Sequence, residues 1–268
     1  MSQPFSLGIH GGTGTTKTSI ALSFPNPVVF DFDQRLGGVK PELLDKVVKR
    51  TSNEYGEYSY PAPIHIPLSG ETRGNQQRIM LHGWKEMYDQ FIQDLLGELA
   101  RPDTGTIFID TGTQMREMAN NAYLQELQES TGQGKDMRVQ LQQIEYGTPN
   151  DRIKAIYATI KGARKYLVVT HYDEDEYVTK EVFDPRNGQM VKESLQTGRR
   201  VLKGFNKTAE IMDMMMVTSL ELANSVVTPY GTVEKAGLAL EMLGVKIQNP
   251  GYDSIVGWLR MLRPGSGW

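Results

Sequence analysis

A glycine-rich loop near the start of the chain constrains the fold more than any other feature. Residues 8–24 read GIHGGTGTTKTSIALSF. Gly11, Lys17 and Thr18 fit the pattern GxxxxGK[ST] of phosphate-binding loops, but Thr16 stands where that pattern has its second glycine. The apolar residues before the loop predict a short strand at 5–10, and those after Lys17 predict a helix at 17–24. A loop of this kind between a strand and a helix indicates an α/β domain.

The chemistry of the loop predicts a site for the phosphates of ATP. Glycines at 11, 12 and 14 let the backbone turn its N–H groups toward an anion. Lys17 can reach the β- and γ-phosphates, and the Thr18 hydroxyl can ligate Mg²⁺. The branched Cβ of Thr16 takes up room beside the phosphates, so we expect binding to survive and hydrolysis to be slow. The residues predicted to hold the nucleotide are Gly11, Gly12, Thr13, Gly14, Thr15, Thr16, Lys17, Thr18 and Ser19.

Several continuous apolar runs predict strands that are buried on both faces. They are PVVFDFD (27–33), TIFID (106–110), KYLVVTH (165–171) and IMDMMMVTSLEL (211–222). Helical spacing at 84–100, 113–128 and 150–161 separates most of them, and 252–262 predicts a last short helix. Such strands alternating with helices predict a doubly wound, mostly parallel sheet. Without a convincing linker, residues 1–268 read as a single domain.

Three regions depart from this alternation. Residues 39–83 are rich in Tyr, Pro and Gly and read as a surface insertion. Residues 176–207 alternate around the sequence DPRNG, which predicts a β-hairpin that projects from the body. The stretch VVTPYGTVEKAGL suggests a further strand after a turn at 229–231.

Polar residues at the ends of the predicted strands are candidates for catalysis. Asp110 ends a buried strand and can support Mg²⁺. Asp31 and Asp33 lie two apart and should point the same way in an extended strand, with Asp33 placed to act as a general base. His171 ends a later strand and can sense the γ-phosphate.

Composition excludes several classes of protein. With 29 basic and 32 acidic residues the net charge is −3, which excludes a polycation but not a local basic surface. The chain has no cysteine, which excludes disulfides and thiolate metal sites. Its four histidines are scattered, which argues against a structural zinc site. No apolar run approaches the length of a membrane span. Because the first residues run directly into the loop, we expect no leader peptide and a cytoplasmic protein.

The order of these motifs resembles that of the RecA-like P-loop ATPases. The motifs are the loop, the strand ending Asp-x-Asp, IFID and VVTH. More narrowly, the chain is similar to phage-encoded RecA-like ATPases of recombination and single-strand annealing, often labelled AAA ATPases. The resemblance implies ATP and Mg²⁺ as cofactors, a catalytic carboxylate at Asp33, a polar switch residue at His171, and Mg²⁺ support from Asp110. It also implies a homo-oligomer, ring or filament, in which Lys235 reaches the neighbouring subunit's nucleotide. The usual glutamate is replaced by Asp33, a second reason to expect slow hydrolysis.

The resemblance further implies action on single-stranded DNA through loops that follow the central strands, here 129–150 and 176–207. The second segment carries seven basic and four acidic residues, a local excess of +3 (7 − 4). Two alternatives stay open. One is a nucleotide-binding switch or scaffold with little turnover. The other is a different P-loop enzyme, such as a packaging motor or a small-molecule kinase that uses GRRVLKGFNK (198–207) as a lid.

Overall fold

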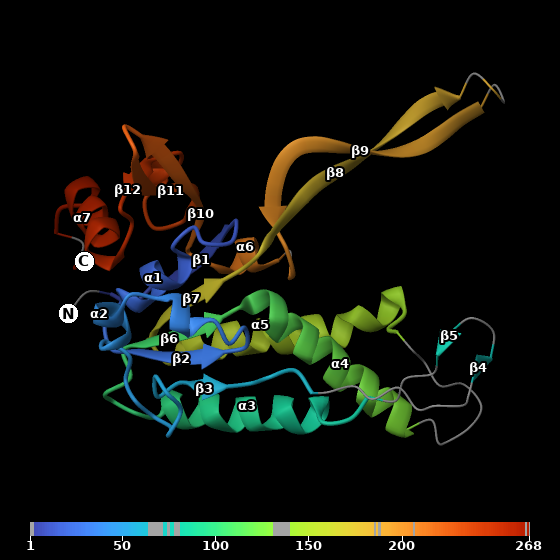
Figure 1. Cartoon of the computed structure of the whole chain (residues 1–268), viewed down its shortest axis with the longest axis horizontal. Helices are drawn as coiled ribbons and strands as arrows, with labels where there is room; N and C mark the ends of the chain where they lie inside the picture. Colours follow the sequence, from blue (N-terminus) through green and yellow to red (C-terminus); the bar gives the residue numbers. More distant parts are fainter. Residues whose placement is uncertain are drawn as a thin grey trace.

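The computed structural model describes residues 3–63, 72–73, 76–77, 81–130, 140–184, 186, 189–205, 207–265 and 267. Its main strands are β1 (Ser6–Gly11), β2 (Pro27–Asp31), β3 (Tyr58–Ser59), β6 (Thr106–Asp110), β7 (Tyr166–Thr170), β10 (Met214–Ala223), β11 (Val226–Ala236) and β12 (Lys246–Gln248). They form one eight-stranded sheet in the order β12-β11-β10-β1-β7-β6-β2-β3 (Figure 1).

The centre of this sheet is parallel, as predicted. Strand β1 pairs in parallel with β10 on one side and β7 on the other. The parallel pairing continues through β6 and β2 to β3, whereas β11 and β12 add an antiparallel edge. The predicted α/β class with a mostly parallel sheet is therefore confirmed. Because β1, β2, β6 and β7 run the same way, the segments that follow them meet at one edge of the sheet.

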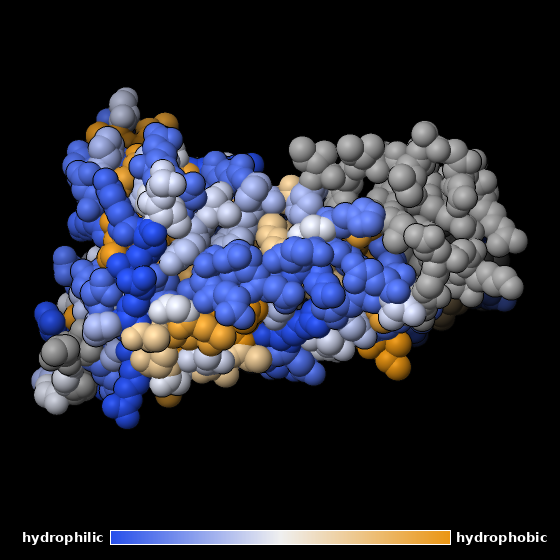
Figure 2. Space-filling view, turned by 90° about the horizontal axis from the view of Figure 1, so that it is seen from below, coloured by the Kyte–Doolittle hydropathy of each residue, from blue (hydrophilic) through white to orange (hydrophobic). Residues whose placement is uncertain are grey.

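Helices cover both faces of the sheet. They are α1 (Lys17–Leu22), α2 (Pro41–Leu44), α3 (Trp84–Leu99), α4 (Gly112–Ser130), α5 (Gly147–Gly162), α6 (Thr208–Ile211) and α7 (Tyr252–Leu262), with short 3₁₀ turns η1 (Leu36–Gly38), η2 (Gln143–Tyr146) and η3 (Leu240–Met242). One apolar cluster joins α3, α4 and α5 to one face, and a second joins α1 and α7 to the other. The outer surface on the α3 side is mostly hydrophilic, with small apolar patches (Figure 2). That polarity fits helices that turn one apolar stripe inward.

Alternation along the central strands explains the two clusters. In β6, Ile107 and Ile109 belong to the cluster under α3, α4 and α5, while Phe108 between them belongs to the opposite cluster. The stripe predicted on 84–100 packs inward, with Phe91 fully buried. Because both faces of these strands are buried, apolar residues follow one another without interruption in their sequences.

The predicted projecting hairpin is present. It consists of β8 (Asp173–Asp184) and β9 (Gln189–Leu202), which pair with each other in a separate two-stranded sheet. It extends far from the body (Figure 1). Residues 185, 187 and 188 at its turn lie outside the described residues. A further small pair consists of β4 (Thr72–Arg73) and β5 (Gln76–Gln77).

Two sequence predictions need correction. Residues 39–83 are not wholly a surface insertion, because β3 extends the main sheet beside β2 and Tyr60 is buried against Phe32. The predicted turn at 229–231 is wrong. Strand β11 runs straight through it, and the chain turns at Asn224 and Ser225, whose φ angles of 51° and 63° suit a two-residue hairpin turn.

Within the described part of the chain, no helix has the length and apolar character needed to cross a membrane.

Candidate functional site

The glycine-rich loop follows β1 and leads into α1, as predicted. Gly11 and Gly14 adopt positive φ angles of 146° and 78°, and a Cβ on Gly11 would come within 2.4 Å of the Thr218 hydroxyl on β10. The Thr15 hydroxyl donates to the Gly12 carbonyl at 2.7 Å and lies 2.7 Å from the Thr218 hydroxyl oxygen. The loop is thus held in shape by its neighbour strand, and its glycines are required by backbone geometry.

Thr16 has a backbone conformation that favours glycine. Its φ is 69°, in the left-handed region, where a β-branched residue is strained. Its hydroxyl donates to the Thr15 carbonyl at 2.5 Å. The pattern's glycine is therefore needed here for its backbone angle as well as for space beside a ligand.

Lys17 is buried, and its ammonium donates to the carbonyls of Gly11 and Gly12 at 2.7 and 2.8 Å. Burial lowers the pKa of Lys17, and the nearby carboxylates of Asp110, Asp173 and Asp33 oppose that change. A cation at the base of the loop, facing carboxylates across a gap, is suited to an anion with an accompanying metal.

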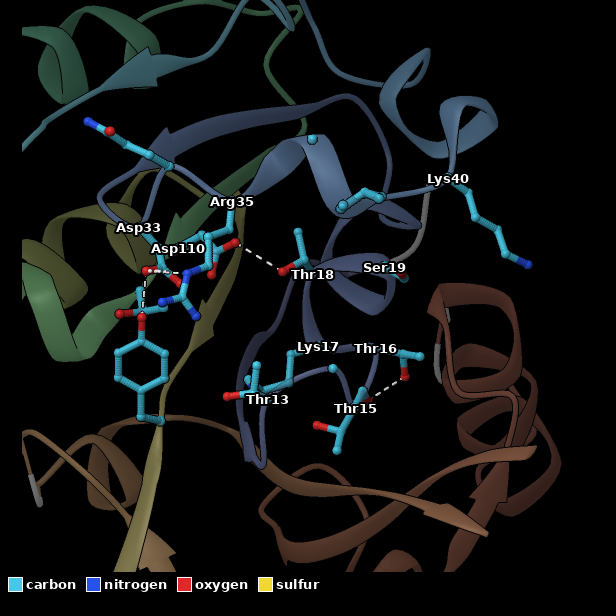
Figure 3. Close-up of a pocket in the computed structure, with 17 residues that line it drawn as sticks. Thr13, Thr15, Thr16, Lys17, Thr18, Ser19, Asp33, Arg35, Lys40 and Asp110 are labelled. Carbon is cyan, nitrogen blue, oxygen red and sulfur yellow. Dashed lines mark hydrogen bonds and ion pairs between the residues drawn. The ribbon is translucent and has the colours of Figure 1, made fainter. Parts of the chain in front are cut away.

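Thr18 and Asp110 meet as the sequence predicted. The Thr18 hydroxyl donates to Asp110 Oδ2 at 3.0 Å (Figure 3). Thr170 donates to the other carboxylate oxygen. Burial raises the pKa of Asp110, and the hydrogen bonds from Thr170 and Thr18 oppose the rise. A hydroxyl and a carboxylate side by side are the hard oxygen ligands that Mg²⁺ takes together with phosphate oxygens. These residues fit the implied metal.

The end of β2 carries Asp31, Asp33 and Arg35, which have different roles. Asp31 Oδ1 accepts from the backbone N–H groups of Asp33 and Gln34 at 2.9 and 2.7 Å, which closes a turn. Burial raises the pKa of Asp31 to about 6, and the Gln34 N–H opposes this. Because β2 ends at Asp31, the two aspartates do not share one direction as an extended strand would require.

Asp33 faces the same gap as Asp110 and is surrounded by donors. The Tyr172 hydroxyl donates to its Oδ1 at 2.5 Å, Gln114 Nε2 at 3.3 Å, and Arg35 Nε lies 3.4 Å away. Arg35 extends beside Asp33 and Asp110 (Figure 3). Burial and the contact with Asp33 both raise the pKa of Tyr172, which keeps its proton available for the hydrogen bond.

These residues line a cavity of about 660 Å³, within the usual range for small-molecule sites. Its described lining residues are Thr13, Gly14, Thr15, Thr16, Lys17, Thr18, Ser19, Asp33, Gln34, Arg35, Gly37, Gly38, Val39, Lys40, Asp110, Thr111 and Tyr172. The structure therefore brings the predicted loop residues, Asp33 and Asp110 together. Arg35 and Tyr172 were missed, although the first lies two residues beyond Asp33 and the second directly follows His171.

His171 is not among the residues that line the cavity. Its side chain is fully buried under the start of α4, where a Cβ on Gly112 would lie 2.5 Å from its Cε1. Burial, together with a smaller contribution from the charge of His10, lowers the pKa of His171 to about 3. In this structure Tyr172 lines the cavity and His171 does not, because neighbouring residues in an extended chain point to opposite sides. A role for His171 in sensing the γ-phosphate stays a prediction.

Lys235 lies on β11 and its ammonium is already engaged. It donates to the carbonyls of Ala209, Glu210 and Met212 at 2.7, 2.9 and 2.7 Å, at the C-terminal end of α6. In the sheet it stands opposite Met215, level with the start of β1 and away from the loop. A role in a neighbouring subunit stays a prediction, and it would require Lys235 to leave these three carbonyls.

The hairpin is fastened to the same edge of the sheet. The Thr113 hydroxyl accepts from Tyr172 N at 3.2 Å and donates to the Lys203 carbonyl at 2.9 Å, and Arg116 donates to the Gly204 carbonyl. Arg200 makes a bidentate ion pair with Asp173 at 2.8 and 2.9 Å. In the hairpin's register Lys180 lies opposite Glu193 and Lys192 opposite Glu181. Of the seven basic residues predicted there, Arg200 is therefore held by an acidic residue outside the segment.

Comparison with known proteins gives a family match and two similar solved structures. A family model described as an AAA domain matches residues 3–234. A KaiC-like protein from Pyrococcus horikoshii is similar in structure, with 11% identity, a TM-score of 0.43, and coverage of 87% of this chain and 80% of that one. The flagellar accessory protein FlaH from Methanocaldococcus jannaschii has 11% identity, a TM-score of 0.40 and coverage of 92% and 85%. A search of curated proteins gave no significant match. The predicted P-loop family is confirmed, and the chain belongs to the AAA domain family.

Proposed function

We propose that this protein binds and hydrolyses ATP with Mg²⁺ and acts on single-stranded DNA. The observation that supports this most strongly is the meeting of Lys17, Thr18 and Asp110 around one cavity beneath a glycine loop. A nucleotide-binding member of the AAA family needs these groups to hold a triphosphate and its metal.

Each residue has a distinct role in the proposed reaction. Lys17 would turn from the loop carbonyls to the β- and γ-phosphates. Thr18 and Asp110 would hold Mg²⁺, which neutralises phosphate charge when bound. Asp33 orients and deprotonates the attacking water, and Tyr172 positions Asp33. Hydrolysis by this arrangement is slow, because Thr16 and Asp33 depart from the usual glycine and glutamate.

Arg35 supplies the second cation from within the same chain. Phosphoryl transfer needs positive charge on the γ-phosphate oxygens as the bond breaks. Arg35 lies beside Asp33 on the cavity wall, and 62% of its side chain is exposed, so its guanidinium can move to a phosphate. Lys235, held at α6, has no such freedom in this structure.

Turnover of radiolabelled ATP, with and without single-stranded DNA, tests the proposal. We expect Lys17→Ala to lose binding of a fluorescent ATP analogue. We expect Arg35→Ala to lower kcat at least about tenfold with KM nearly unchanged, since its charge acts in the transition state. Lys40→Ala is the matched control, because Lys40 lines the cavity but extends away from Asp33 and Asp110 (Figure 3). Equal ATP affinity in wild type and Lys17→Ala would refute the site. Tight binding with no turnover would favour the switch alternative.

The DNA part of the proposal is supported by the hairpin and its attachment. Arg199 lies exposed on β9, and Lys203 lies exposed just after the end of β9. Helix α4, which follows Asp110, holds the base of the hairpin through Thr113. Stimulation of turnover by single-stranded DNA is the expected result, and its absence would remove DNA from the proposed function. A phage origin and a recombination pathway stay predictions.

A further inference from the structure

The hydroxyl of Thr113, in the first turn of α4, joins the two ends of the hairpin. It accepts from Tyr172 N at 3.2 Å and donates to the Lys203 carbonyl at 2.9 Å. Lys203 N in turn donates to the Tyr172 carbonyl at 2.9 Å. Tyr172 directly precedes β8, and Lys203 directly follows β9. One side chain of α4 therefore fixes the backbone of Tyr172 at the point where the chain enters and leaves the hairpin.

Tyr172 carries this constraint to Asp33. Its hydroxyl donates to Asp33 Oδ1 at 2.5 Å. Gln114, the residue after Thr113 in α4, donates to the same oxygen from Nε2 at 3.3 Å. A tyrosine has a rigid ring and only two side-chain torsions, so a shift of the Tyr172 backbone displaces its hydroxyl. Both donors to Asp33 Oδ1 thus depend on backbone that lies at or beside Thr113.

The end of the hairpin next to Thr113 is itself held firmly. Arg200 makes a bidentate ion pair with Asp173, with N–O distances of 2.8 and 2.9 Å. Farther out, the pairing of β8 with β9 shifts register between Asp175 and Tyr177. A bulge of this kind bends a strand locally, so it separates the pairs beside Thr113 from the projecting part of the hairpin. The inner pairs therefore support the site.

We propose that Thr113 is a positioning residue for Asp33. Its hydroxyl fixes Tyr172, and the Tyr172 hydroxyl fixes the direction of the Asp33 carboxylate. This role rests on the proposed function of Asp33 as general base, and it requires no ligand on the hairpin. A base must meet the attacking water at hydrogen-bond distance, and a displacement of about 1 Å is costly. Thr113 is not among the lining residues of the nucleotide cavity, so ATP affinity should not depend on it.

The first measurement is steady-state ATP hydrolysis by Thr113→Val, which keeps the shape of the side chain and removes both hydrogen bonds. We expect kcat to fall about tenfold with KM nearly unchanged, because the effect lies in the direction of the base. Thr113→Ser keeps the hydroxyl and should restore most of the wild-type kcat.

Thr51→Val is the matched control. The Thr51 hydroxyl also accepts from a backbone N–H, that of Asn53 at 3.1 Å, and donates to a carbonyl, that of Glu57 at 2.6 Å. Thr51 is not among the residues that line the nucleotide cavity. Thr51→Val loses the same kinds of hydrogen bond as Thr113→Val, and it should keep the wild-type kcat.

A double-mutant cycle separates positioning from a general effect on folding. Tyr172→Phe should lower kcat at least as much as Thr113→Val, and the two changes together should lower it no further than Tyr172→Phe alone. Independent effects would multiply instead, to about a hundredfold loss for two tenfold changes. A multiplied loss, or a wild-type kcat in Thr113→Val, would overturn the role of Thr113 and leave the proposed ATPase intact.

If wild type binds ATP without turnover, the proposed hydrolysis fails, and fluorine NMR of protein labelled with 3-fluorotyrosine decides the role of Thr113. The Tyr172 resonance is the one that is missing from Tyr172→Phe. Thr113→Val should shift it in the same direction as Asp33→Asn, whereas Thr51→Val should leave it in place. That result would uphold the positioning of Asp33 by Thr113, and a Tyr172 resonance unmoved in Thr113→Val would overturn it.

Discussion

Thr16 has a backbone conformation that suits glycine better. A φ near 69° costs a non-glycine residue roughly 1–2 kcal/mol, and a β-branched side chain belongs at the upper end. The residue lies directly before Lys17, so this strain is stored in the loop that would hold the phosphates. The hydrogen bond between the hydroxyls of Thr15 and Thr218 fixes the surrounding loop, and the fixed loop keeps Thr16 in this strained conformation.

The first prediction follows from that strain. Thr16→Gly should stabilise the fold by about 1 kcal/mol, since relief of the left-handed strain exceeds the extra entropy of glycine in the unfolded chain. It should also speed turnover or tighten ATP binding. Thr13→Gly is the control, because Thr13 lies in the same loop without a positive φ and should lose about 0.5–1 kcal/mol. Chemical denaturation measures both changes. A loss of activity in Thr16→Gly would show that the Thr16 hydroxyl contacts the nucleotide.

A second prediction concerns His171 and pH. Its folded pKa of about 3 lies below the unfolded value, so its contribution to stability is complete above pH 6.5 and is lost as pH falls toward 3. Wild type should lose about 2 kcal/mol from this group between pH 7 and pH 5. His171→Asn should lower stability at pH 7 but remove this slope. Identical pH slopes in denaturation curves of the two proteins would contradict the assignment.

Residues of the site were predictable where a motif fixes their spacing, and less so where a strand end had to be located. Lys17, Thr18 and Asp110 follow from the loop pattern and an apolar strand. Asp31 ends β2 by bonding its own turn, which redirects Asp33 and brings Arg35 to the cavity. That contact depends on one side-chain hydrogen bond, which the sequence pattern does not reveal. The position of Tyr172 rather than His171 in the cavity depends instead on which side of the chain faces the cavity after β7 ends.

At the scale of elements, long apolar runs were reliable and short or polar ones were not. The helix at 84–100 and the central strands appear as predicted. Strand β3 has only two residues and depends on its pairing with β2, so no local pattern marks it. The dipeptide before Val226 is Asn-Ser, a weaker turn signal than the Pro and Gly inside β11, and pairing with β10 overrides that stronger signal.

The hairpin supplies the third prediction. Arg199 lies exposed on β9, whereas the guanidinium of Arg200 is bound by Asp173. Arg199→Ala should therefore weaken single-strand binding and reduce the log–log salt slope by about 0.7, the value for one lost phosphate contact. Arg200→Gln should leave the slope unchanged. Anisotropy titrations over a range of salt concentration test this, and an equal effect of both variants would show that the ion pair opens on binding.

At the scale of the whole molecule, the residues of the candidate site lie at one edge of the parallel sheet. The loop, Asp110 and the hairpin base all follow strands that end together. This arrangement was predictable from the order of apolar runs. The antiparallel β11 places Lys235 opposite Met215 and level with Gly8, away from the edge where the loop lies.

The fourth prediction asks whether subunits complete one another's sites. Lys235→Ala should lower stability by about 1–2 kcal/mol, because the last carbonyls of α6 lose their charged donor. If that is its whole role, the folded variant hydrolyses ATP like wild type. If Lys235 also acts in a neighbouring subunit, the variant is inactive, and mixing it with Lys17→Ala subunits restores ATPase activity. Inactivity without restoration would contradict action between subunits.

The hairpin has a consequence for the behaviour of the protein at high concentration. The main sheet ends in edge strands of three and two residues, β12 and β3, which offer few backbone groups to another chain. Strands β8 and β9, of 12 and 14 residues, pair with no other described strand along their outer edges. They also carry exposed Tyr177, Phe183 and Met190. Long open edges of this kind promote edge-to-edge aggregation, so the hairpin governs the solubility of the whole chain.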